Sequence, residues 1–531
     1  MTLRTLLCAT AFAAVIAQPA IAAPPKPQPG DPIMMGDGFS FDPIIEGRLR
    51  YEHVDQPTTD ADALTMRLRA GGELKHSSGL ALLVEGVGTL AIINHYNAFP
   101  FASTSGQRRP AFSVVADPMT VGLNRLQLQY KSKPFTLTVG RQRINLDDQR
   151  WVGNAGWRQD EQTFDAVRAE AKLGPVNFDG TYSISQRSIF GVDAGPRQAY
   201  GGDFIMLGAG AKLGSVNVKG FAYLLDYNEA FFFANSSQTY GARATSSLTL
   251  APKVKLNLAA SYARQSSYGT TPFAFAADYI AGEAALGWKD LTLTAGYEKM
   301  GSDGLHAVQT PMATLHKFDG WADLFLTTPA GGIQDYYGGA AIKFPKVKAL
   351  PGLNAAVTYH QFDSDKGGLH YGNEWDASLG FKVKRMNLLA KYADDHRNGY
   401  PSRLTLGDSL VGQSAIEKRR IHMAIVVDEY GGTAGLLTAE EILLNGMSKA
   451  TDVASGGRHM SNHFAKPAIG IQNVSSCVSN HSHLANACAR CVLPLHARAS
   501  RVLGGLHQQR RLRPVVEPRQ ERIQLVLPVI H

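Results

Sequence analysis

Apolar and polar residues alternate with a period of two over most of residues 44–394. In VNFDGTYSISQR, Val176, Phe178 and Tyr182 fall on one face, while Asp179 and Arg187 fall on the other. This is the period of a β-strand with one apolar and one polar face. Such segments recur about seventeen times along the chain, so the sequence predicts an all-β fold.

The connections between these segments alternate in length. Short turns, such as GP at 174–175 and KD at 289–290, alternate with long loops, such as 94–119, 144–162 and 300–333. A soluble two-sheet sandwich also has alternating strands. Alternation in loop length favours a transmembrane antiparallel β-barrel, in which short turns face the periplasm and long loops face outward. A closed barrel leaves no unpaired strand edge in lipid.

The N-terminal segment predicts export. Residues 1–22 have a positive start, an apolar middle and a small-residue cleavage site, as a secretory signal peptide does. No later run of about 18 apolar residues predicts a membrane helix. We expect a linker over 23–43, a barrel over 44–400 and a location in the bacterial outer membrane, with its lipid as a partner.

The strand count raises a difficulty. Single-chain bacterial barrels have an even number of strands, and the seventeenth predicted strand ends near residue 394. The following sequence, PSRLTLGDSLV at 401–411, alternates only briefly. The sequence therefore predicts a barrel of the 18-strand type whose last strand is missing and whose seam stays open.

One long loop and its flanking strands carry an unusual density of both charges. It reads GRQRINLDDQRWVGNAGWRQDEQTFDAVR at 140–168. With RLRYEHVDQ at 48–56, SISQRSIFG at 183–191 and LHKFDGWADLFLTTPAGGIQDYYGG at 315–339, it resembles the alginate-export-type outer-membrane porins. The resemblance spans about 44–394. It implies an 18-stranded barrel with an arginine-rich lumen that passes a polyanionic uronate chain.

The resemblance and the strand parity together nominate a set of lumen residues. By position, the resemblance implies constriction arginines with acidic partners, namely Arg141, Arg143, Arg150, Arg158 and Arg168 with Asp147, Asp160, Glu161 and Asp165. Strand parity adds further inward arginines, Arg48, Arg50, Arg67, Arg69, Arg125 and Arg187, and the acids Glu85, Glu170 and Asp179. Guanidinium groups keep their charge and fit carboxylates, and rings of cations select anions. The alternative is a solvated loop held by ion pairs.

Strand parity conflicts with the predicted lumen position of two arginines. Leu137 and Val139 are expected to face lipid, which places Arg141 and Arg143 on the same face. Either Gly140 marks a bulge that reverses the face, or the strand has already left the membrane there. Trp151 and Trp157 are expected to pack within the loop. Four tyrosines are expected to face outward or lie at the interface: Tyr51, Tyr130, Tyr182 and Tyr223.

Residues 418–445 follow another pattern. MAIVVD is apolar throughout, as in a soluble buried sheet, and Thr438 begins a T-x-x-E capping box. The segment resembles half of a CBS domain of CorC/HlyC-type transport proteins. The resemblance implies ribose contacts by Thr438 and Glu441, the latter in place of the usual Asp. Half a domain is too short to bind a nucleotide, so we expect a junction over 401–417 between unrelated genes.

The tail, 446–531, accounts for the basic charge. It holds eleven Lys or Arg and three Asp or Glu, against 53 and 45 in the whole chain, so the rest is balanced. Nucleic-acid binding is therefore not predicted. The Cys488-x2-Cys491 pair lacks a standard partner set for zinc, and the tail is expected to be disordered or out of frame.

The sequence predicts a channel without catalysis, metal or cofactor. The barrel region shows neither a nucleophile–base pair nor a metal-ligand set. An anionic polysaccharide or similar organic anion is the expected solute. Three alternatives stay open at this point: a barrel enzyme, a nucleotide-sensing CBS regulator, and a non-functional fusion whose barrel cannot close.

Overall fold

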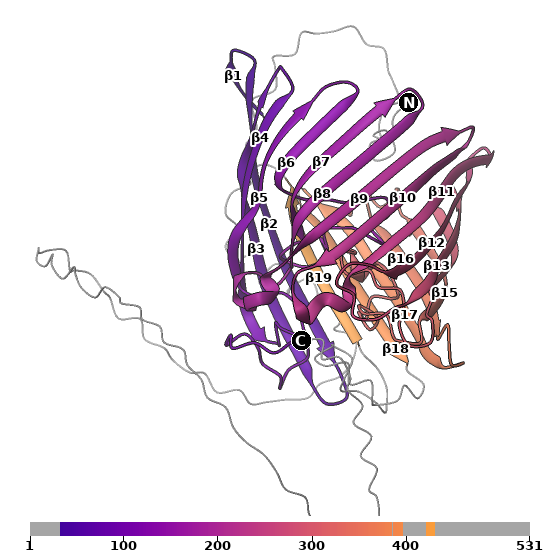
Figure 1. The fold of residues 1–531 in the computed structure, drawn as a ribbon. Helices are drawn as coiled ribbons and strands as arrows, with labels where there is room; N and C mark the ends of the chain where they lie inside the picture. The colour runs from indigo at the N-terminus through magenta and orange to yellow at the C-terminus, as the bar shows by residue number, and fades with distance from the viewer. Residues whose placement is uncertain (1–31, 385, 397–420, 431–531) are drawn as a thin grey trace, which may run out of the picture. The chain divides into compact units, whose positions relative to one another are not determined.

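The computed structural model describes residues 32–384, 386–396 and 421–430. Their regular structure is almost entirely one antiparallel β-sheet. From β2 to β19 each strand pairs with its neighbours in sequence, and β19 pairs with β2, so these eighteen strands close into a barrel (Figure 1). The all-β prediction of an 18-strand barrel is confirmed.

The strands and short 3-10 helices have the following bounds: β1 Ile33–Gly36, β2 Phe39–Asp55, β3 Asp60–His76, β4 Leu80–His95, β5 Thr120–Lys131, β6 Phe135–Gln142, β7 Thr163–Leu173, β8 Val176–Arg187, η2 Val192–Gln198, β9 Ala199–Leu213, β10 Val216–Tyr227, η3 Ala230–Asn235, β11 Ser237–Ala251, β12 Val254–Ser267, β13 Ala276–Trp288, β14 Leu291–Met300, η4 Leu315–Lys317, β15 Ile333–Lys343, β16 Asn354–Asp363, β17 His370–Val383, β18 Met386–His396 and β19 Ile421–Tyr430.

The prediction of an open seam is wrong. β19 supplies the eighteenth strand: Ile421 pairs with Asp394 of β18 on one side and with Asp55 of β2 on the other. Its sequence, IHMAIVVDEY, lies within the segment that resembles a CBS domain. The uniformly apolar run therefore forms a barrel strand rather than a strand of a small α/β unit.

Several other predictions fall outside the described residues. They are the signal peptide, the junction, the rest of the CBS-like segment with Thr438 and Glu441, and the tail. Within the described residues, no helix is long and apolar enough to cross a membrane.

The strands bury one face and expose the other. Along β3, Arg67 and Arg69 are buried, whereas Met66 and Leu68 are 41% and 49% exposed. Successive side chains of a strand point to opposite faces, so the charged residues face the interior and the apolar residues form the outer surface. An apolar outer face and a polar lumen are the arrangement of a barrel in lipid.

The short turns and long loops lie at opposite ends of the strands (Figure 1). Several short turns have two residues, and Gly174, Gly214 and Lys289 adopt left-handed backbone conformations there. Such conformations fit the twist of tight hairpins. Two long loops, 143–162 and 301–332, fold into the lumen. Arg48 and Arg67 of the wall donate hydrogen bonds to carbonyls of the first, and the backbone N–H of Ala322 in the second donates to the buried carboxylate of Glu374 on β17.

An apolar cluster packs where these loops meet the wall. It includes Ile144, Phe204, Tyr227 and Met312, each fully or almost fully buried. Tyr223 belongs to the same cluster and is 3% exposed. Its predicted outward orientation is therefore wrong: its register partner is Met206, which is also buried and faces the interior.

Candidate functional site

The loop 143–162 folds into a compact series of irregular turns rather than a strand or helix. Asp147, Gln149 and Ala155 have positive φ angles, which reverse the chain direction within a few residues. Internal backbone hydrogen bonds close the turns, for example from the N–H of Leu146 to the carbonyl of Val152 at 3.0 Å. A segment rich in Asn, Asp and Gly has this conformational freedom, so its charged side chains can reach several strands.

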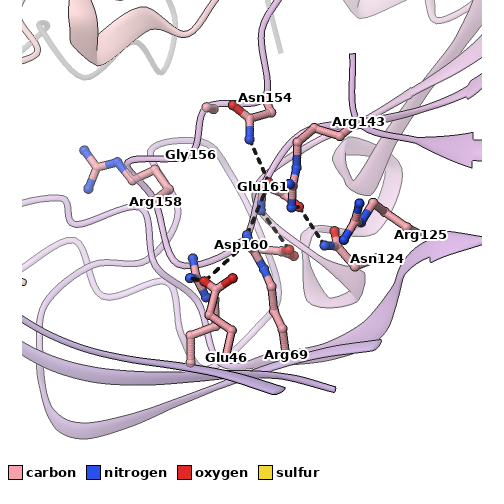
Figure 2. A network of polar contacts seen from close by, with 12 residues as sticks. Glu46, Arg69, Asn124, Arg125, Arg143, Asn154, Gly156, Arg158, Asp160 and Glu161 are labelled. Carbon is pink, nitrogen blue, oxygen red and sulfur yellow. Dashed lines mark hydrogen bonds and ion pairs between the residues drawn. The ribbon is translucent and has the colours of Figure 1, made fainter. Parts of the chain in front are cut away.

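Glu161 is the centre of a buried polar network (Figure 2). Its carboxylate accepts hydrogen bonds from Asn124 at 2.7 Å, Asn154 at 2.8 Å and Arg143. Arg69 forms an ion pair with it at 3.2 Å. Burial alone would raise the pKa of Glu161, but the guanidinium groups of Arg69 and Arg143 outweigh it and lower that pKa to about 2. Glu161 therefore ties the loop to β3 and β5.

Asp160, the adjacent acid, behaves in the opposite way. Burial raises the pKa of Asp160 to about 7, and the negative charge of Glu161 adds to this shift. The backbone N–H of Glu161 donates to Asp160 Oδ1 at 2.9 Å. Neighbouring acids thus have separate charge states near neutral pH: Glu161 is ionised, and Asp160 titrates.

Arg150 and Arg158 clamp the two lumen loops together. Arg150 lies 2.8 Å from Glu298 of β14 and 2.8 Å from Asp319 of the loop 301–332. Arg158 lies 3.3 Å from Glu52 of β2 and 2.6 Å from Asp323 of that same loop. Both arginines are buried, so these charges hold structure rather than face a passing solute.

The same holds for most wall arginines of β2 and β3. Arg50 pairs with Glu52 and Asp117, and Arg67 pairs with Glu46. Arg48 donates to the carbonyls of Gly156 and Arg158 at 2.9 and 3.2 Å. The structure thus places these predicted pore arginines behind the loop, where they anchor it.

A second set of cations, on β5, β7, β10 and β11, remains partly exposed. Arg125, Arg168, Lys219 and Arg243 have side chains 17–21% exposed. Their nearest ion-pair distances are 2.6 Å from Arg125 to Glu85, 2.9 Å from Arg168 to Glu170, 2.9 Å from Lys219 to Asp179 and 2.6 Å from Arg243 to Asp148.

A bulge helps to build this wall. In β5 the register slips next to Glu85, so the consecutive residues Asn124 and Arg125 both reach that carboxylate. Lys219 also contacts Asp147 at 3.1 Å, a loop acid nominated above. Lys219 and Arg243 were missed in the sequence, although each shares the parity of buried neighbours on its strand: Phe221 and Tyr223 for Lys219, and Ser237 and Thr239 for Arg243.

Arg141 and its partner lie on the other face of the sheet. Pairing is continuous through Gly140, so no bulge reverses the face there, although Gly140 has a φ of +112°. Arg141 lies opposite Asp165, 2.7 Å away, in register with the exposed pair Val139 and Val167. The predicted inward orientation of Arg187 is also wrong: its partner Ala199 shares the outward parity of exposed Asp203 on β9, whereas Tyr200 and Phe204 face inward. Arg143, by contrast, reaches Glu161.

The loop tryptophans are packed, as predicted. Trp157 stacks on His316 with ring centroids 4.5 Å apart, and Arg50 lies 4.6 Å from its ring. Trp151 packs edge-on against Tyr279 at 5.2 Å. Among the described residues, no group of three or more His, Cys, Asp or Glu side chains is arranged to hold a metal ion.

Comparisons with known proteins support both resemblances over short segments. A family model described as alginate export matches residues 106–184, which include the loop 143–162. The UPF0053 protein YugS of Bacillus subtilis (strain 168) is 71% identical over 28 residues, which is 5% of this chain and 6% of that protein. The chain thus spans a small fraction of that curated relative.

Solved structures share the fold over most of the chain. Pseudomonas aeruginosa OpdK with vanillate has a TM-score of 0.54 and 14% identity, covering 74% of this chain and 98% of that one. Acinetobacter baumannii OccAB3 has a TM-score of 0.55 and 14% identity, covering 73% and 99%. At such identity the likeness shows the fold, that of a bacterial outer-membrane β-barrel.

Proposed function

We propose that this chain is an outer-membrane channel that conducts organic anions, with acidic saccharides of the uronate type as the finer candidate. The observation that carries the proposal is the partly exposed wall of Arg125, Arg168, Lys219 and Arg243 facing the lumen. Fixed cations along a narrow path favour anions. The alginate-export match over 106–184 and the barrel likeness to a porin solved with vanillate, a carboxylate, support the same chemistry.

The proposal assigns two roles to the charged residues nominated from the sequence. Arg50, Arg67, Arg69, Arg150 and Arg158 hold the constriction loop. The exposed set meets the solute. Transport of this kind requires no nucleophile or metal.

Charge reversal of the exposed set tests the proposal. Two unit charges 4 Å apart in water interact by about 1 kcal/mol. Arg168→Glu or Lys219→Glu is therefore expected to lower the anion-to-cation permeability ratio roughly fivefold or more. The measurement is the reversal potential in planar bilayers under a salt gradient.

Arg264→Glu is the matched control. Arg264 is 55% exposed, pairs with Asp278, and shares the outward parity of exposed Tyr262 on β12. Its reversal is expected to leave the ratio within error of the native value. A native channel that prefers cations, or an equal effect of Arg264→Glu, contradicts the proposal.

A further inference from the structure

Six lysines recur at the turn end of the barrel, each within two residues of a strand terminus. They lie on six different strands: Lys131 on β5, Lys172 on β7, Lys212 on β9, Lys255 on β12, Lys343 on β15 and Lys382 on β17. We refer to them as the lysine collar. All six side chains are exposed.

Register places the collar on the lumen face. Lys172 follows Arg168 and Glu170 at spacings of two along β7, opposite Asn177. Lys382 follows Asp376, a buried inward residue, with the same parity and no slip in register. Lys212, Lys255 and Lys343 likewise share the parity of buried Met206, Ala263 and Asp335. Lys131 lies opposite Thr136, which shares the parity of buried Thr138 on β6. Side chains at even spacing along a strand share a face.

The collar lacks the compensation found deeper in the lumen. Among the described residues, the ion pairs and side-chain hydrogen bonds include none made by these six lysines. Two inward acids at this end, Asp42 and Glu73, lie 3.2 and 2.8 Å from a seventh lysine, Lys75. Deeper cations such as Arg125 and Lys219 each have an acidic partner. Uncompensated positive charge is therefore concentrated at one mouth.

We propose that the lysine collar captures polyanionic chains at the turn-end mouth and is a specificity determinant for multivalent over monovalent anions. This inference rests on the proposed function and names its solute class more closely. A ring of separated ammonium groups can engage several carboxylates of one chain at once, whereas a single carboxylate meets one or two. Charge focused at a mouth raises the local concentration and on-rate of the opposite charge by roughly 10- to 1,000-fold.

The test compares the native full chain with three variants in planar bilayers. One variant replaces all six collar lysines with Gln. A second replaces the same six with Arg, which keeps the charge. The matched control replaces six exposed lysines in the turns of the same end: Lys133, Lys253, Lys289, Lys346, Lys348 and Lys384. It changes the net charge equally without altering the inward face.

The probes are an oligouronate of defined length and the monomeric uronate, each added to one side at a time. For the native channel, the oligomer on the turn side is expected to block current at concentrations at least tenfold below those needed for the monomer. The Gln variant is expected to lose that difference, and the Arg variant and the turn control to retain most of it. The block is expected to weaken with added salt.

Two outcomes overturn the inference. One is an equal loss of block in the turn control, which assigns the effect to general rim charge. The other is an unchanged block in the Gln variant. Folding of every variant is checked by its heat-modifiable migration on a gel. The Arg variant carries substitutions at the same six sites, so its retained block shows that substitution there does not disrupt the barrel. If the native channel prefers cations, the proposed function fails. If the native channel prefers anions but the oligouronate still blocks the Gln variant at the native concentration, this inference alone fails.

Discussion

At the scale of single residues, burial and neighbouring charges give two adjacent carboxyl groups different pKa values. Glu161 and Asp160 are neighbours in sequence, yet their pKa values diverge to about 2 and about 7. The difference follows from partners: Glu161 faces Arg69 and Arg143, while Asp160 is buried next to a carboxylate. Sequence spacing alone could not assign these states, because both acids fit the same motif.

Asp160 is expected to make selectivity depend on pH. Its pKa is raised from the ordinary value of 3.8 to about 7 in the folded chain. The neutral carboxyl group therefore stabilises the fold fully below pH 3.8, and this stabilisation is lost as the pH rises through about 7. Above that pH it adds a negative charge to the loop 143–162, which lies in the lumen. The anion-to-cation permeability ratio is therefore expected to fall between pH 6 and 8.

Asp160→Asn is expected to flatten this dependence, because the amide keeps the shape but cannot ionise. The measurement is the reversal potential from pH 5 to 9. Asp203→Asn, at an exposed acid with an outward register, is the control and is expected to follow the native curve. A native curve that is flat across neutral pH argues against a titrating Asp160.

At the scale of elements, the strands could be predicted and the loop contacts could not. Period-two alternation is local, so β2–β18 and the inward parity of Arg67, Arg69 and Arg168 follow from the sequence. The clamps from Arg150 to Asp319 and from Arg158 to Asp323 join loops more than 160 residues apart. Nothing in either segment alone specifies that meeting. β19 was missed because MAIVVD carries no alternation.

Glu161 is expected to anchor the loop 143–162 to the barrel wall. Glu161→Ala leaves Arg69 and Arg143 without this partner, and breaking a buried ion pair costs about 3–5 kcal/mol. We expect the loop 143–162 to detach, with a larger single-channel conductance and cleavage within the loop by added protease. Both are measured on folded protein in bilayers and in detergent.

Asp278→Ala is the control for Glu161→Ala. Asp278 is 39% exposed and pairs with Arg264, and exposed pairs contribute about 0–1 kcal/mol. It is expected to leave conductance and protease resistance unchanged. A Glu161→Ala channel of native conductance would show that the loop is held chiefly by the clamps of Arg150 and Arg158.

At the scale of the whole molecule, two charge patterns divide the barrel. In the loop half, cations and acids are paired and buried, and they fix the two lumen loops. At the turn end, the lysine collar is exposed without acidic partners among the described residues. Under the proposed function, the paired region sets the shape of the path and the unpaired region sets the electric field at its entrance. Capture of a long polyanion would use both, since shape alone does not attract a charged chain.

Closure of the barrel is expected to depend on residues 421–430. β19 pairs with β18 and with β2, and each unpaired backbone group in lipid costs several kcal/mol. Loss of a ten-residue strand therefore exceeds the 5–15 kcal/mol by which a domain is usually stable. A chain ending after residue 396 is expected to aggregate, whereas a chain ending after residue 435 is expected to fold. Membrane fractionation followed by gel migration with and without boiling compares the two. A compact, heat-modifiable species from the shorter chain would show that seventeen strands suffice, and failure of both chains would show that residues after 435 are also needed for folding.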